Sequence, residues 1–191
     1  ARLREALSRK DTPAMRTLLL GLGNPILTDD SVGIRLAADI AARLGARPGV
    51  DVLPDCPLTG LGLLDVLPGY DRIIVLDSIR TAGGIPADWY RFTAESLRET
   101  THLSNIHDAN FATALELGRR MGRPLPFDRE IHILAVEVEE NAAFSEALSP
   151  RLAEAYPRIL EEVCAEVRDI LERPADPIPR TPCTCREGTR S

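Results

Sequence analysis

Short apolar runs alternate along the chain with segments in which apolar residues recur at helical spacing. Continuous apolar runs are typical of strands that are buried on both faces of a sheet, and helical spacing indicates amphipathic helices. The runs predict strands at 17–20, 50–53, 72–77, 89–93 and 130–138. The helical spacing predicts helices at 31–44, 61–67, 109–121 and 151–172.

This alternation predicts an α/β fold: a three-layer α/β/α domain with a mainly parallel, twisted sheet of about five strands and right-handed crossovers. Residues 16–173 form the single predicted domain, because the patterned block is continuous and its length suits one domain. Residues 1–15 are expected to be an N-terminal tail. Residues 174–191 contain four prolines together with Cys183 and Cys185, and are expected to be a mobile C-terminal tail.

The charge balance is acidic, because 29 Asp and Glu residues face 23 Lys and Arg residues for a net charge of −6. Nucleic-acid binding needs clustered basic residues, so no nucleic-acid partner is expected. The only lysine is Lys10, which excludes a P-loop nucleotide site and a lysine-bound pyridoxal cofactor. Unevenly spaced cysteines and the lack of a long apolar stretch predict a reduced, cytoplasmic protein with no membrane partner.

Candidate catalytic or metal-binding residues lie at or after the ends of three of the predicted strands. The pair Asp29-Asp30 comes after the first, Asp77 ends the third, and His107 lies in the expected loop after the fourth. Functional groups of open α/β sheets gather beyond the carboxyl ends of the strands, so Asp30, Asp77 and His107 are expected at one edge. Two carboxylates and an imidazole suit a borderline divalent metal such as nickel or zinc, and they also suit acid–base catalysis.

Each of these positions also has a structural interpretation. Asp29 precedes a helix, so capping of that helix is its ordinary role, and position alone leaves Asp30 evenly divided between capping and function. His102 shares a loop with His107 and competes with it for a place in the site. His132 alternates within a predicted strand and is expected to be structural.

The glycine-rich segment after the first strand carries the most specific motif. Residues 21–33 have the sequence Gly-Leu-Gly-Asn-Pro-Ile-Leu-Thr-Asp-Asp-Ser-Val-Gly. This segment resembles the opening signature of the NiFe-hydrogenase maturation endopeptidases, in which a Gly-x-Gly-Asn strand exit precedes an acidic pair and an early helix glycine. The resemblance continues at the apolar strand that ends in Asp77 and through the His107 loop to Leu148-Ser149-Pro150, and covers roughly residues 16–172.

The resemblance implies a fold of the phosphorylase/hydrolase-like type and an endopeptidase activity. Such an enzyme removes a short C-terminal extension from the large-subunit precursor of a NiFe hydrogenase after nickel insertion. The family's nickel-binding carboxylates and histidine correspond to Asp30, Asp77 and His107, which are then both the catalytic and the metal-contacting residues. The implied cofactor is nickel presented by the precursor, the implied partner is that precursor, and a monomer or weak dimer is the default expectation.

Two positions depart from the family pattern. Asn105 stands where the family often has Ser or Thr two residues before its histidine, although the spacing into the next helix still favours His107 over His102. Val138-Glu139 stands where the family tends to have Pro-Glu after its late strand, which predicts a differently shaped loop and a different substrate choice. The residues leave open whether the metal or a carboxylate activates the hydrolytic water.

Other function classes remain as alternatives. Peptidyl-tRNA hydrolases share the Gly21–Pro25 strand exit, but their later Thr-Arg-His-Asn stretch is missing and the acidic charge disfavours tRNA. A non-catalytic, nickel-dependent docking or chaperone module for the precursor would use the same three ligands. A serine or cysteine hydrolase is disfavoured, because there is no Gly-x-Ser-x-Gly elbow and Cys56 has no evident partner base.

Overall fold

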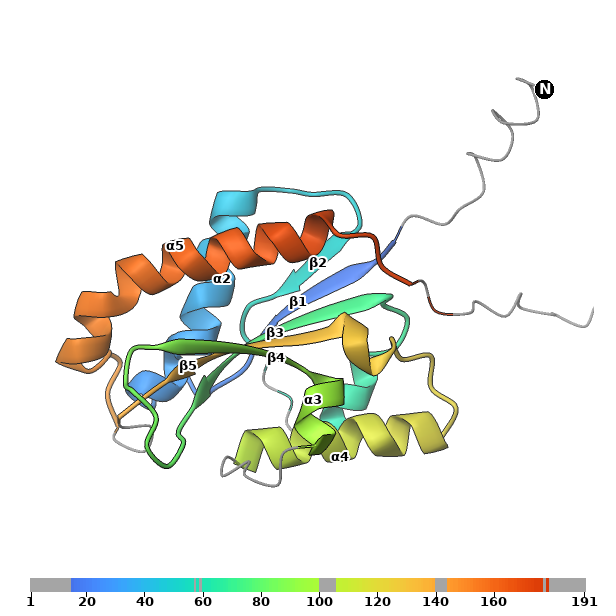
Figure 1. The fold of residues 1–191 in the computed structure, drawn as a ribbon, viewed down its shortest axis with the longest axis horizontal. Coiled ribbons are helices and arrows are strands. Elements are labelled where there is room, and N and C mark those ends of the chain that lie inside the picture. The colour runs from blue at the N-terminus through green and yellow to red at the C-terminus, as the bar shows by residue number, and fades with distance from the viewer. Residues whose placement is uncertain are drawn as a thin grey trace, which may run out of the picture.

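The computed structural model of the chain (Figure 1) describes residues 15–56, 58, 60–99, 106–139, 144–176 and 178, with the backbone alone for 97–99 and 106–110. His102, Asn105, Cys183 and Cys185 lie outside the described residues. In chain order the elements, with η for a 3-10 helix, are β1 (Thr17–Gly21), η1 (Asp29–Ser31), α2 (Val32–Leu44), β2 (Val50–Leu53), η2 (Gly60–Asp65), β3 (Arg72–Ile79), β4 (Trp89–Thr93), α3 (Ala94–Glu99), α4 (Ile106–Arg120), η3 (Asp128–Glu130), β5 (Ile131–Glu137) and α5 (Pro150–Glu172).

The strands form one five-stranded sheet in the order β2-β1-β3-β5-β4. The first four strands of that order run parallel, and β4 pairs antiparallel with β5. The chain reaches β4 from β3 through residues 80–88, which contain no helix. A parallel neighbour needs a long crossover, so this short connection returns the chain in the opposite direction. The prediction of a mainly parallel sheet of about five strands is confirmed.

Helices cover both faces of the sheet, as Figure 1 shows. One core lies under α2 and α5, and its buried side chains include Leu19, Leu36, Ile74, Ile159 and Val167. The other lies under η2 and α4, and its buried side chains include Leu18, Leu63, Val75, Leu115 and Ile133. Neighbouring residues of each strand enter opposite cores because side chains alternate along a strand. The predicted three-layer α/β/α architecture is confirmed.

Two predicted boundaries near the candidate site are wrong. Asp77 was predicted to end its strand, but β3 continues to Ile79 because the backbone pairs with β5 as far as Glu137. His107 was predicted to lie in a loop, but α4 begins at Ile106, so His107 occupies its first turn. The apolar periodicity of this helix becomes visible only near Phe111, and sequence pattern therefore places its start too late.

A buried ion pair fastens the C-terminal end of α5 to the amino ends of the strands. The Arg72 side chain is 2% exposed, and its Nε donates to Glu130 Oε2 at 3.0 Å. Its Nη1 donates to the carbonyl oxygens of Ile170 and Arg173. Beyond α5, the Ile178 side chain is buried and its backbone N–H donates to Asp71 Oδ1 at 3.1 Å. Ile178 therefore lies against the sheet.

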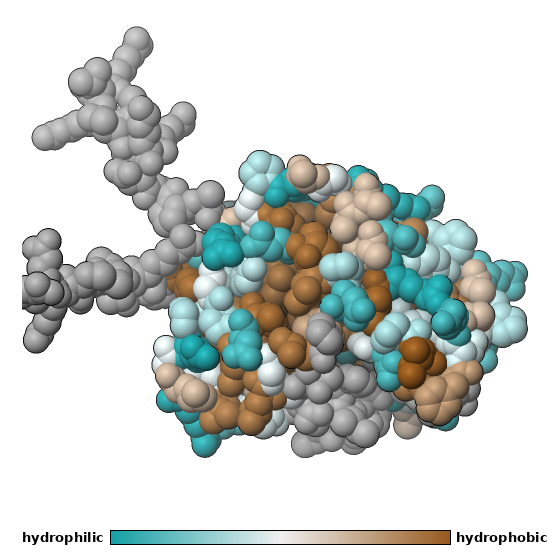
Figure 2. All heavy atoms as spheres, turned by 180° about the vertical axis from the view of Figure 1, so that it is seen from behind, coloured by the Kyte–Doolittle hydropathy of each residue, from teal (hydrophilic) through white to brown (hydrophobic). Residues whose placement is uncertain are grey.

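The face turned away in Figure 1 carries a band of apolar surface among polar side chains (Figure 2). A cavity of about 390 Å³ is lined by residues that include Arg16, Leu18, Val52 and Tyr70. Arg16 precedes β1 and Tyr70 precedes β3, so this cavity lies toward the amino edge of the sheet. None of the described helices has both the length and the apolar character needed to cross a membrane.

Candidate active site

Glycines bring the start of α2 into direct contact with the carboxyl edge of the sheet. Gly23 has a φ of +132°, and a Cβ there would lie 1.9 Å from the Asp30 carbonyl oxygen. A Cβ on Gly33 would lie 2.4 Å from the carbonyl oxygen of Leu76 in β3. Only glycine tolerates both the conformation at 23 and these close approaches. The motif glycines therefore set the position of Asp30 relative to β3.

Asp30 is buried in η1, with an exposed fraction of 3%. Its Oδ2 accepts a hydrogen bond from the backbone N–H of Asn24 at 2.8 Å, and its Oδ1 accepts one from Ser78 Oγ at 2.8 Å. The Asn24 side chain accepts from the Ile26 N–H at 3.2 Å, which fixes the loop. Asp30 is therefore held by hydrogen bonds to two separate elements.

Asp77 lies on β3, next to Ser78, and is 2% exposed. Its Oδ1 accepts a hydrogen bond from the backbone N–H of Ser78 at 2.8 Å. Ser78 thus donates its hydroxyl to Asp30 and its N–H to Asp77, so one residue contacts both predicted site carboxylates. Ser78 is not among the site residues predicted from the sequence, although its place directly after Asp77 is a usable signal.

The backbone of His107 lies in the first turn of α4, on the same face of the sheet as η2. The side chain of His107 lies outside the described residues, so the structure does not test its contact with either carboxylate. Among the side chains that are described, no group of three or more His, Cys, Asp or Glu residues is arranged to hold a metal. The three-ligand site therefore stays a prediction, of which two carboxylates are located.

Asp29 does not cap α2, contrary to the ordinary role expected for it. Its Oδ1 accepts a hydrogen bond from the backbone N–H of Ser149 at 2.7 Å, 120 positions away. Its Oδ2 is buried and has no hydrogen-bond partner among the described residues. Ser149 in turn caps α5, because its Oγ accepts from the Leu152 N–H at 3.4 Å. Asp29 therefore ties the beginning of α5 to the segment that carries Asp30.

A further buried carboxylate, Glu137, lies at the end of β5, opposite Ile79 of β3. Its Oε1 accepts from the Thr81 N–H at 2.6 Å and its Oε2 accepts from Thr81 Oγ1 at 2.8 Å. A Cβ on Gly84 would lie 2.2 Å from the Glu137 carboxyl carbon, so the loop packs directly on this group. Glu137 fixes the 80–88 loop beside the site, a role that sequence analysis missed.

Cys56 and His132 were set aside on the sequence, and the structure gives both a structural place. The Cys56 thiol contacts the Leu58 carbonyl oxygen at 3.7 Å, and burial raises its pKa, which keeps it protonated and poorly nucleophilic. His132 lies on β5, where it pairs with Ile74 of β3, far from the carboxyl edge. Neither residue belongs to the carboxylate cluster.

Comparison with known proteins connects this site to a family. A model of the family described as hydrogenase maturation protease matches residues 34–166, which include Asp77 and His107 and begin just after Asp30. The hydrogenase 2 maturation protease of Escherichia coli K12 is 27% identical over 156 residues, which cover 81% of this chain and 92% of that protein.

Solved structures show the same fold. The hydrogenase maturating endopeptidase HybD of E. coli superposes with a TM-score of 0.68 at 25% identity, covering 85% of this chain and 98% of that one. The NiFe-hydrogenase maturation protease HybD of Thermococcus kodakarensis gives a TM-score of 0.59 at 23% identity, covering 80% and 99%. The resemblance seen in the sequence is confirmed, and the peptidyl-tRNA hydrolase alternative gains no support. This chain belongs to the hydrogenase maturation protease family and is a protease.

Proposed function

We propose that this protein removes the C-terminal extension from the large-subunit precursor of a NiFe hydrogenase once nickel is in place. Family membership supports the precursor as partner. The contact of Ser78 with both Asp30 and Asp77 carries the assignment of the site, because it places two buried carboxylates at the edge where α/β enzymes bind substrate.

Nickel enters this proposal as part of the substrate. Carboxylate oxygens and an imidazole nitrogen are suitable ligands for a borderline divalent ion, and Asp30, Asp77 and His107 supply that set. When these groups contact nickel held by the precursor, an empty precursor lacks the contact and binds less tightly. The metal would therefore report that assembly has reached the correct stage.

Peptide hydrolysis requires a base and an acid at the scissile bond. The oxygen of water bonds to the carbonyl carbon, the C–N bond breaks, and the proton lost by water is transferred to the departing amine. A carboxylate performs both proton transfers if it lies within hydrogen-bond reach of the water. Asp30 or Asp77 would serve in this way directly, or would act on a water already activated by the precursor's nickel.

We also propose that the reaction takes place in the cytoplasm and that the enzyme acts as a monomer or weak dimer. The described cysteines Cys56 and Cys164 are free and buried. Free thiols fit a reducing compartment.

The direct test is cleavage of a purified, nickel-loaded precursor, followed by intact-mass spectrometry of the large subunit. Wild-type protein should shorten the subunit by one C-terminal peptide. Asp30→Asn and Asp77→Asn should each lower the rate by at least about a hundredfold without unfolding the protein, because each removes a charged group from the site. The exposed Asp65→Asn variant is the matched control and should cleave normally.

The same readout applies in cells. In a strain that lacks the gene, the large subunit should keep its extension, and the wild-type gene but not Asp77→Asn should restore trimming. Normal processing by both aspartate variants would refute the proposed site. Wild-type protein that binds the loaded precursor without cutting it would instead support a non-catalytic docking module.

A further inference from the structure

Two apolar side chains stand exposed where the loop after β1 meets the loop before α5. Phe144 is 83% exposed and Ile26 is 51% exposed. The backbones pair here, since Leu27 forms an antiparallel bridge with Phe144 and the Ser145 N–H donates to the Ile26 carbonyl oxygen at 3.1 Å. We call these four residues, Ile26, Leu27, Phe144 and Ser145, the Ile26–Phe144 rim.

The rim is anchored to the segment that carries the site carboxylate. Leu27 accepts from the Ser31 N–H at 3.2 Å, one residue beyond Asp30. On the other loop, the Glu146 carbonyl accepts from the Arg35 guanidinium, and Ser149 donates to Asp29. The backbone that carries the two exposed apolar side chains is therefore hydrogen-bonded to the segment that contains Asp30.

The location of the rim determines what can cover it. Asp30 and Asp77 are 3% and 2% exposed, so a scissile bond reaches them only from the carboxyl edge, between the loops that follow the strands. The rim belongs to two of those loops. A protein substrate that delivers its C-terminal segment to the carboxylates approaches this edge, where Ile26 and Phe144 are exposed.

We propose that the Ile26–Phe144 rim binds an apolar segment of the large-subunit precursor adjacent to its C-terminal extension and thereby sets the register of the cut. This inference rests on the proposed function. Exposed aromatic side chains contribute strongly to protein–protein binding because they bury a large apolar area. The rim adds binding that does not depend on nickel, so a nickel-free precursor loses the metal contact but keeps this one.

The experiment measures KM and kcat for cleavage of the nickel-loaded precursor by Phe144→Ser. The KM should rise by about tenfold or more while kcat stays within about twofold, since the substitution removes binding area and leaves Asp30 and Asp77 in place. Phe144→Leu should keep a KM near that of wild type, because an apolar side chain remains. The thermal unfolding midpoint of Phe144→Ser should equal that of wild type. If Phe144 had a purely structural role, the substitution would lower that midpoint.

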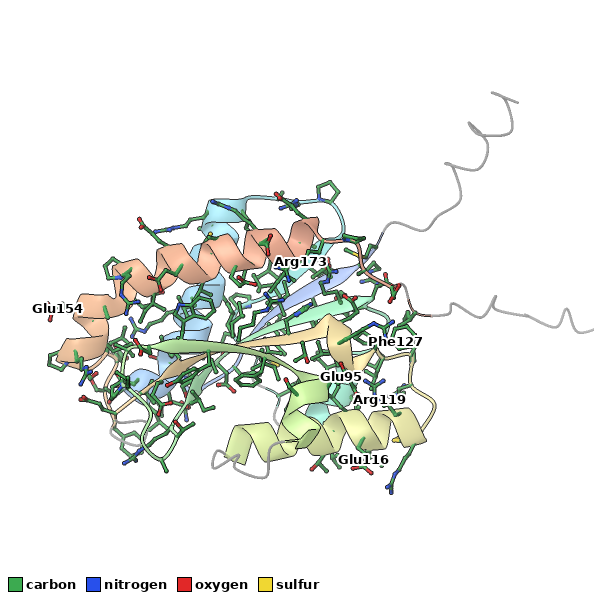
Figure 3. All side chains as sticks on the ribbon, viewed as in Figure 1. Glu95, Glu116, Arg119, Phe127, Glu154 and Arg173 are labelled. Carbon is green, nitrogen blue, oxygen red and sulfur yellow. The ribbon has the colours of Figure 1, made fainter. Side chains whose placement is uncertain are left out.

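Phe127→Ser is the matched control. Phe127 is 40% exposed and lies near the amino edge, next to η3. Figure 3 shows Phe127 toward one end of the molecule and Glu154, from the start of α5, at the other. The KM of this variant should equal that of wild type.

Binding assays separate failure of this inference from failure of the proposed function. If wild-type protein does not cleave, the proposed activity fails, and the dissociation constant for the precursor still tests the rim. Weaker binding by Phe144→Ser than by Phe127→Ser, with nickel-loaded and with nickel-free precursor, supports the rim. Equal KM and equal dissociation constants overturn it. So does a wild-type dimer, seen by sedimentation, that Phe144→Ser dissociates without changing KM.

Discussion

The two edges of the sheet bury charged groups in different ways. At the amino edge, Arg72 pairs with Glu130 and also donates to two backbone carbonyl oxygens at the end of α5. At the carboxyl edge, Asp30 accepts from a backbone N–H and a hydroxyl, both of which are neutral. The paired charges at the amino edge fasten elements together, whereas the hydrogen bonds at the carboxyl edge orient a carboxylate where α/β enzymes bind substrate.

This difference separates stability from activity. Changes at the amino edge should lower the free energy of unfolding and leave the turnover of the folded enzyme intact. Changes at the carboxyl edge should lower turnover and reduce the free energy of unfolding much less. Figure 3 shows that Arg173, which belongs to the amino-edge contacts, and Glu154 lie at opposite ends of α5, so one helix spans both regions.

The largest effect on stability should come from Arg72→Met. Glu130 would then be left buried without its cation, and the carbonyl oxygens of Ile170 and Arg173 would lose their donor. Breaking a buried pair in this way costs about 3–5 kcal/mol of unfolding free energy, which urea denaturation measures. The kcat of the protein that remains folded should equal that of wild type.

The double variant Arg72→Met/Glu130→Leu controls for the unpaired carboxylate. It should recover part of the lost stability, because an apolar pair no longer leaves a buried charge. A loss below about 1 kcal/mol in Arg72→Met, or a double variant no better than the single one, would contradict the role assigned to this ion pair.

A second effect, also at the amino edge, concerns pH. His132 is 7% exposed, and its Nδ1 has no hydrogen-bond partner among the described residues. Burial, with repulsion from Arg72, Arg91 and Arg173, lowers the pKa of His132 from 6.5 to about 4. The unfolded chain therefore binds the proton more readily than the folded one, so stability is complete above pH 6.5 and falls as the pH drops toward 4. The loss is about 3 kcal/mol over that interval.

His132→Leu isolates this contribution, because the variant has no group to protonate at that position. The unfolding free energies of wild type and variant, measured by denaturation at several pH values, should differ in their pH dependence between 6.5 and 4. Parallel curves would show that His132 does not titrate as its surroundings indicate.

The smallest effect should come from Ser78→Ala at the carboxyl edge. Asp30 loses the hydroxyl donor, while Asp77 keeps the backbone N–H of residue 78. The kcat should fall by about tenfold and stability by about 1 kcal/mol, since the hydrogen bond from the Ser78 hydroxyl to Asp30 is removed. Ser96→Ala, which removes the hydroxyl that accepts from the Thr93 N–H, is the control and should leave kcat unchanged. An unchanged kcat in Ser78→Ala would show that the Ser78 hydroxyl does not position Asp30 for activity.

Sequence patterns located the central strands well because these strands are buried on both faces of the sheet. All eight residues of β3 are buried, so its apolar run is continuous and easy to recognise. Asp30 and Asp77 were found because each follows or ends such a run, at the edge where parallel strands present their functional groups. The antiparallel direction of β4 was not predicted, because the residue pattern of neither β4 nor β5 indicates which strand it pairs with or in which direction.

Residues that act across long sequence separations could not be found in this way. Ser78 contacts Asp30 from 48 positions away, and Asp29 contacts Ser149 from 120 positions away. Asp29 stands at a position that suits a helix cap, yet its carboxylate serves another helix. Glu137 sits in a buried strand where an apolar residue would be expected, which was the one visible sign that it has a partner.

The bond between Asp29 and Ser149 also bears on how the enzyme is made. During synthesis Asp30 and Asp77 are made first, whereas Phe144 of the Ile26–Phe144 rim and Ser149, the cap of α5, follow later in the chain. Contacts so distant along the chain close late in folding. The nascent protein thus holds its carboxylates without the surface that we propose guides a substrate onto them. Proteolytic competence should therefore appear only after Phe144 and Ser149 have been synthesised.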